Sequence, residues 1–287
     1  MWKWAALIVL LLIVAVVAIL YLLYRSASVE ADAAFADLEA RAKPAGEGFD
    51  PADLADLPEI ARRYFAHAIA PGTPLTTVAS LEMEGTFLLG DAKQFQTYSM
   101  RARQILAPPA EFVWIPEMKS GLIEITGSDA LVHGKAWTRF WIDRLVPVVN
   151  QPTSPDLVRS ALTRSAMEAV WAPASLLPAN GVGWSQTGPD TARLTFSTGI
   201  EPVDMRLDAT GRVLQIVTMR WSDANREKTF RLQPFGASVE AEATFGGFTI
   251  PSQLKVGNHF GTQDYLPFFQ ARITAAHYLP VHPAPTD

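Results

Sequence analysis

The chain has 287 residues, of which 49% are hydrophobic and 18% are charged, a composition typical of a globular protein with a packed core. The formal net charge is −5, which argues against nucleic acid as a partner because phosphate binding needs clustered Lys and Arg. The chain has no cysteine, so disulfides, thiolate nucleophiles and Cys-ligated metal centres are excluded.

The first element is an uncharged apolar run from Trp4 to Leu23. As a helix it is about 30 Å long, the thickness of the hydrocarbon layer of a bilayer. We therefore expect residues 1–25 to form a transmembrane anchor, with the membrane lipid bilayer as the partner of residues 4–23. Trp and Tyr at both ends of the run fit the two interfaces.

The alternative for this segment is a signal peptide cleaved near residues 26–28, but the apolar core of a signal peptide has only about 7–15 residues. Lys3 precedes the run, whereas Arg25 and then Glu30 and Asp32 follow it. This asymmetry favours a cytoplasmic N-terminus. We expect a single-pass protein of the bacterial cytoplasmic membrane whose bulk lies on the periplasmic or extracellular side.

Residues 26–55 are predicted to be a juxtamembrane helix and a linker, because residues 29–43 are rich in Ala, Leu and Glu and residues 44–48 read PAGEG. Residues 56–287 are predicted to be a β-rich domain that begins with an amphipathic helix over 57–70.

From about residue 75 the period of the apolar residues changes to two, which indicates strands with one buried and one exposed face. The strands follow one another through short connections, including a hairpin at 208–211, DATG, so antiparallel pairing is expected. The predicted fold is mainly β (α+β): one strongly curved antiparallel sheet or half-barrel with a covering helix. The predicted strands are 97–106, 111–115, 122–125, 129–137, 192–197, 203–208, 213–221, 228–232, 239–244, 248–256 and 268–277, besides a first strand near 79–87.

The covering helix is predicted over residues 155–171. Ser154 is a good N-cap, and Pro173 ends the helix. Arg164, Glu168 and Trp171 fall on one stripe. We interpret the stripe first as a structural contact that holds the helix against the sheet. The alternatives are that Arg164 binds a ligand, or that Glu168 acts as a general acid or base.

No catalytic residues, metal ligands or cofactors are predicted. The five His residues have no zinc-site spacing, and the chain has no nucleotide-binding loop and no nucleophile elbow. Six Trp residues follow the first segment, and large rings commonly fill a sheet core. They could also line an apolar groove for a lipid or another amphiphile. The candidates for that groove are Trp114, Trp137, Trp141 and Trp221.

Four stretches resemble an uncharacterised bacterial family of membrane-anchored or exported proteins, a domain of unknown function. They are LPEIARRYF at 57–65, the R-x-x-x-E-x-x-W-x-P stretch within 164–184, Arg220 after the hairpin, and GGFTIPSQLKV at 246–256. The resemblance carries over no activity. It marks a set of structural or ligand-gripping residues: Arg164, Glu168, Trp171, Trp184 and Arg220. The strand-rich pattern is similar to the half-barrel of periplasmic lipoprotein carriers.

Three functional hypotheses follow. The first is a membrane-anchored exported domain that binds a hydrophobic ligand or an envelope component and is not an obvious enzyme. The second is a hydrolase or transferase that uses Glu168 and Arg164. The third is a structural envelope protein without a ligand.

Overall fold

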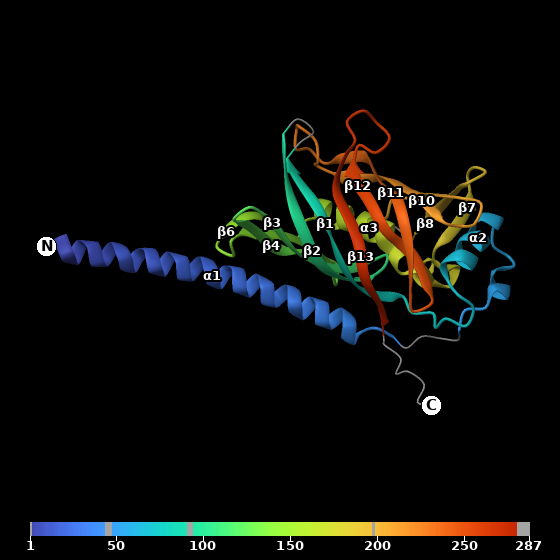
Figure 1. Cartoon of the computed structure of the whole chain (residues 1–287), viewed down its shortest axis with the longest axis horizontal. Coiled ribbons are helices and arrows are strands. Elements are labelled where there is room, and N and C mark those ends of the chain that lie inside the picture. Colours follow the sequence, from blue (N-terminus) through green and yellow to red (C-terminus); the bar gives the residue numbers. More distant parts are fainter. Residues whose placement is uncertain (1, 44–47, 91–93, 197–198, 280–287) are drawn as a thin grey trace.

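The computed structural model describes residues 2–43, 48–90, 94–196 and 199–279. These residues form thirteen strands in one antiparallel sheet, in the order β6-β5-β4-β3-β2-β1-β13-β12-β11-β10-β9-β8-β7 (Figure 1). β6 and β7 are its edges, so the sheet is not closed. The strands are β1 Val78–Gly90, β2 Phe95–Ala107, β3 Glu111–Ser120, β4 Ile123–Val132, β5 Lys135–Ile142, β6 Val146–Gln151, β7 Gly183–Gln186, β8 Thr191–Thr195, β9 Val203–Leu207, β10 Val213–Ser222, β11 Arg231–Phe245, β12 Phe248–Asn258 and β13 Leu266–Leu279.

The predicted fold class is confirmed: one curved antiparallel sheet with a covering helix. In β1 the alternation places Leu81 and Met83 in the core, while Glu82 is exposed on the outer face. Helix α3 (Pro155–Glu168) lies against the inner face of the sheet, where it contacts β2, β3, β4, β5 and β10 (Figure 1). Ser154 caps it by accepting a hydrogen bond from the Leu157 N–H at 3.1 Å. Short 3-10 turns continue the chain at Ala169–Trp171, Pro173–Leu176 and Pro178–Asn180.

A second helix, α2 (Glu59–Ala68), follows the 3-10 turn Pro51–Leu54 and covers the sheet near β7, β8 and β12. Its buried Tyr64 and Phe65 pack against Trp184, with ring centroids 5.3 and 5.2 Å apart. In the hairpin between β9 and β10, Gly211 has a φ of 95° and lies so close to the Arg63 carbonyl that a side chain would clash. The predicted turn at 208–211 is therefore confirmed, and α2 packs against it.

Several predicted strand boundaries were wrong. The strand expected over 129–137 contains the hairpin between β4 and β5, where His133 and Gly134 both have positive φ. One long strand, β11, contains the end of the strand expected over 228–232 and all of the strand expected over 239–244, and its register shifts near Ala241; residues 228–230 precede it and are not in a strand. β6 was not predicted, because its sequence VPVVNQ carries no alternation.

Helix α1 (Trp2–Ala40) is continuous through the predicted anchor and the predicted juxtamembrane helix, and most of the predicted linker, residues 44–47, lies outside the described residues. Among the described helices, α1 alone is long and apolar enough to cross a membrane. Its C-terminal part packs Phe35 and Leu38 against the outer face of the sheet, on β2 to β5. Burial of each such side chain contributes about 1.5–3 kcal/mol, which fixes α1 to the domain.

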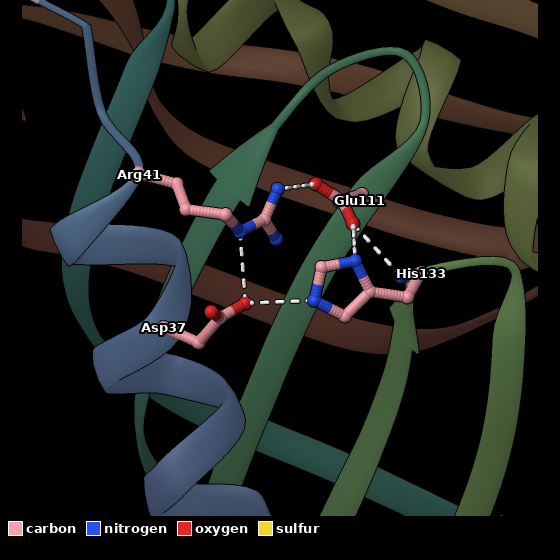
Figure 2. Close-up of polar contacts among 4 residues, drawn as sticks. All are labelled: Asp37, Arg41, Glu111 and His133. Carbon is pink, nitrogen blue, oxygen red and sulfur yellow. Dashed lines mark hydrogen bonds and ion pairs between the residues drawn. The ribbon is translucent and has the colours of Figure 1, made fainter.

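Four polar residues complete this contact at the end of α1 (Figure 2). Arg41 donates from Nε to Asp37 and from Nη1 to Glu111, both at 2.8 Å. Glu111 also accepts from the backbone N–H of His133 at 2.8 Å, and the His133 ring lies 3.0 Å from Asp37. The cluster thus joins α1 to β3 and to the turn between β4 and β5.

Acid is predicted to loosen this contact. Burial alone would raise the pKa of Glu111, but hydrogen bonds from Arg41 and from the His133 backbone outweigh burial and lower it. A lowered carboxyl pKa stabilises the folded state above the ordinary value near 4.5, and this stabilisation is lost as the pH falls through the lowered value. We expect Glu111→Gln to increase amide exchange in residues 27–40 at neutral pH, and the difference from wild type to shrink as the pH falls well below the ordinary glutamate value near 4.5. Equal exchange of the two proteins at neutral pH would contradict the role of this cluster.

Candidate functional site

An apolar cavity of about 300 Å³ lies between the inner face of the sheet and α3. Its wall is mainly aromatic and aliphatic, which suits an apolar ligand better than a polar one. The aromatic residues of the wall come from strands far apart in the sequence: Phe87, Trp114, Phe140, Phe235, Phe268 and Phe269, together with Trp171.

Arg164 on α3 reaches the cavity wall and carries the main polar network. It forms ion pairs with Asp129 on β4 and with Glu168 one helical turn later, the latter at 2.7 Å between Nε and Oε1. Its guanidinium lies 4.5 Å from the centre of the Phe112 ring. The side chain is only 14% exposed, so these contacts replace most of its hydration.

The two carboxylates have further partners. Glu168 accepts a hydrogen bond from the buried amide of Gln104 at 2.6 Å, and Asp129 accepts one from the Thr138 hydroxyl at 2.8 Å. Each oxygen of Glu168 is therefore engaged. The network ties α3 to β2, β4 and β5, as the structural interpretation of Arg164 and Glu168 expects.

The network also determines the ionisation of Arg164. Burial alone would lower the pKa of Arg164, but the charges of Glu168 and Asp129 outweigh burial and raise it. The guanidinium is thus a permanent cation whose charge is already balanced inside the protein.

Arg220 on β10 is in a different position. It donates to the Ser160 hydroxyl at 3.2 Å and lies over the Phe235 ring at 4.8 Å. Among the described residues, no carboxylate lies within ion-pair distance of it. Burial, followed by repulsion from Arg164, lowers the pKa of Arg220 to about 10. Arg220 is still charged near neutral pH, and most of its N–H donors have no partner among the described residues.

A smaller and more polar pocket of about 210 Å³ adjoins the apolar cavity. The two pockets share Asp129, Thr138, Arg164, Arg220 and Phe268. Arg220 therefore stands at the boundary between an apolar chamber and a polar one.

Trp171 also lines the cavity, and two hydrogen bonds hold it. Its indole N–H donates to the Pro251 carbonyl at 3.0 Å, and its own carbonyl accepts from the Tyr278 hydroxyl at 3.1 Å. Trp184 does not line the cavity. It donates to the Leu176 carbonyl at 2.8 Å and packs against α2.

The four Trp residues that were candidates for an apolar groove lie in three different places. Trp114 lines the cavity. Trp221 lies outside it, where its N–H donates to Asp156 near the start of α3 at 2.8 Å. Trp137 and Trp141 lie on the outer face of the sheet: Trp137 packs in the cluster beneath α1, and Trp141 contacts Tyr24.

Sequence reasoning missed Gln104, Asp129, Thr138 and Ser160, which complete the polar contacts of the site. Each is a single polar residue on a strand or helix with no motif around it. For Gln104 and Asp129 a signal existed, because each is polar at a position that strand alternation points toward the core. Among the described residues, no group of three or more His, Asp or Glu is placed to hold a metal ion.

The chain belongs to the Family of unknown function (DUF6544), whose model matches residues 47–271. No curated protein matches it in sequence. It is similar to a solved LolA superfamily protein from Nitrosomonas europaea at 9% identity and a TM-score of 0.38, over 79% of this chain and 93% of that one. It is also similar to a DUF1329 family protein from Desulfovibrio piger at 9% identity and a TM-score of 0.40, over 77% and 91%.

Removal of one partner from the Arg164 network is predicted to destabilise the fold. Glu168→Gln should lower the free energy of unfolding by about 3 kcal/mol, because it leaves a nearly buried guanidinium with one carboxylate fewer. The matched control is Glu201→Gln, which removes the partner of the more exposed Arg159 and should cost less than about 1 kcal/mol. Chemical denaturation of the full chain in detergent measures both. Equal stability of the two variants would show that the network does not hold α3 in place.

Proposed function

We propose that this protein is a membrane-anchored domain that binds an amphiphile with an apolar chain and an acidic head group. Residues 4–23 would span the bacterial cytoplasmic membrane, with the remainder of the chain on its outer side. The observation that carries the proposal is the apolar cavity with the unpaired cation Arg220 at its polar end.

The size and lining of the cavity support the apolar part of the ligand. At about 300 Å³ it lies at the lower end of the range for small-molecule sites. Leu89 and Val148 in its wall are exposed to solvent. Burial of an alkyl chain there removes apolar surface of both ligand and protein from water, at roughly 25 cal/mol per Å².

The charges support the acidic part of the ligand. A buried cation is costly unless it is paired, and Arg220 has only a neutral hydroxyl and a ring as partners. A carboxylate or phosphate group beside Arg220 would accept charge-assisted hydrogen bonds from its free donors. Arg164 is less suited to this role, because Asp129 and Glu168 already balance its charge.

The geometry favours binding over a reaction at Glu168. Both oxygens of this carboxylate accept hydrogen bonds from protein groups, so the catalytic alternative would require the network that holds α3 to break. If the binding tests below fail, the remaining hypothesis is a structural protein without a ligand.

The cavity is predicted to bind dansyl-undecanoic acid, a fluorescent fatty acid. In the full chain held in amphipol, Val149→Trp should reduce the affinity at least about tenfold, because the larger ring fills the cavity from edge strand β6. The control is Met219→Trp, an exposed residue of β10 that does not line the cavity. Dansyl emission reports both affinities, and equal binding by the two variants would place the probe outside the cavity.

Arg220 is predicted to select the acidic head group. Arg220→Gln should weaken binding of the dansyl acid about tenfold, since a charge-assisted hydrogen bond is worth about 1.5–3 kcal/mol. Binding of the corresponding neutral amide should change little. The control is Arg206→Gln, at an exposed position of β9. A parallel loss for acid and amide would mean that Arg220 only shapes the cavity.

A further inference from the structure

An apolar rim stands at the end of the domain from which the free part of α1 emerges. We propose that this rim rests in the surface of the membrane and opens the cavity onto the bilayer. The rim consists of Leu122, Ile123, Val146 and Val148, and the inference rests on the proposed function: that residues 4–23 span the membrane and that the cavity binds an apolar chain.

The orientation of α1 is fixed by contacts along its C-terminal half. Besides the packing of Phe35 and Leu38, Glu30 pairs with Arg139 and Asp32 pairs with Arg103 on the outer face of the sheet. These contacts, spread over about two turns of the helix, hold its axis in one direction relative to the sheet. A bilayer that contains the N-terminal half of α1 must therefore meet one particular end of the domain.

The end that meets the bilayer is marked by Tyr24. Its ring lies 5.7 Å from that of Trp141, near the end of β5, and the helix residues before Tyr21 are largely exposed. One residue after Trp141, Ile142 on β5 pairs with Ile125 on β4 and with Val146 on β6. The turns that join β3 to β4 and β5 to β6 thus lie at the level of Tyr24, where Figure 1 shows β6 beside α1.

The side chains at these two turns are apolar and exposed. Leu122 is 100% exposed, and Val146 and Val148 are 52% and 46% exposed. Exposed large aliphatic residues grouped at loop tips commonly mark an interaction surface. Lys119 and Arg144 flank them with side chains about half exposed to solvent, and both pair with Glu124. Apolar tips at the end of the domain from which the anchor emerges fit the interface of a membrane.

The rim is continuous with the cavity. Val148 belongs to both, and Ile125, two residues beyond Ile123 on the same face of β4, lines the cavity wall. An apolar chain could therefore pass between the bilayer and the cavity along an apolar surface. Transfer through water would expose that chain and would be slower.

The absence of cysteine from the chain permits a direct test. Single variants Ile13→Cys, Leu122→Cys and Ala209→Cys of the full chain would be labelled with the fluorophore NBD. They would then be placed in phosphatidylethanolamine–phosphatidylglycerol vesicles that contain a doxyl-labelled lipid as quencher. Ile13 reports the anchor, and Ala209 is the matched aqueous control, in the turn between β9 and β10 beside α2.

We expect lipid quenching at Ile13 and Leu122 and none at Ala209. Quenching at Ile13 with an aqueous signal at Leu122 would overturn the rim and leave the anchor intact. An aqueous signal at Ile13 would instead overturn the anchor of the proposed function, and the rim with it.

A second variant tests whether the rim speeds the transfer of an apolar chain from the bilayer to the cavity. Leu122→Glu combined with Val146→Glu should slow the uptake of dansyl-undecanoic acid from vesicles at least about tenfold, because the charges lift the rim from the interface. Equilibrium binding of the same probe by this variant in amphipol should match wild type, since neither residue lines the cavity. Unchanged uptake from vesicles would overturn the opening of the cavity onto the bilayer.

Discussion

The ion-pair network around Arg164 is the interaction on which the arrangement of the domain depends. A curved sheet with an apolar inner face must cover that face, and α3 does so together with α2 and the 3-10 turns that follow α3. The contacts of Arg164 with Asp129 and Glu168, and of Glu168 with Gln104, join this helix to strands β2 and β4. Because the helix is held at these points and does not fill the concave side, a cavity remains beside it.

The same network gives the two arginines of the site different roles. Two carboxylates balance the charge of Arg164 and raise its pKa, whereas Arg220 lies partly buried beside it without a paired carboxylate and has its pKa lowered to about 10. A cation left in this state at the boundary of an apolar cavity favours an anionic ligand group. The proposed specificity for an acidic amphiphile thus follows from how charge is distributed around α3.

Much of the fold could be predicted from local pattern, whereas the site could not. Two-residue alternation predicted the antiparallel sheet, and Ser154 predicted the start of the covering helix, which ends as an α-helix at Glu168 and continues as a 3-10 turn to Trp171. Strand alternation points Asp129 and Gln104 toward the core, but their pairing with Arg164 and Glu168 depends on register across the sheet, which no local pattern encodes. The sequence also does not show which face of the sheet each Trp occupies. A shift of one residue along a strand moves a side chain to the other face, and Trp114 lies in the cavity whereas Trp137 lies beneath α1.

The central claim is that the concave side of the sheet holds the apolar chain of an amphiphile. A fatty acid with a diazirine near its methyl end, photolysed with the full chain in amphipol, tests it most directly. Peptide mass spectrometry should find adducts on cavity-wall segments of β3, β5 and β13, with Trp114, Phe140 and Phe268 as the modified residues. Adducts confined to residues 4–23 of α1, or spread over the outer face of the sheet, would contradict the account.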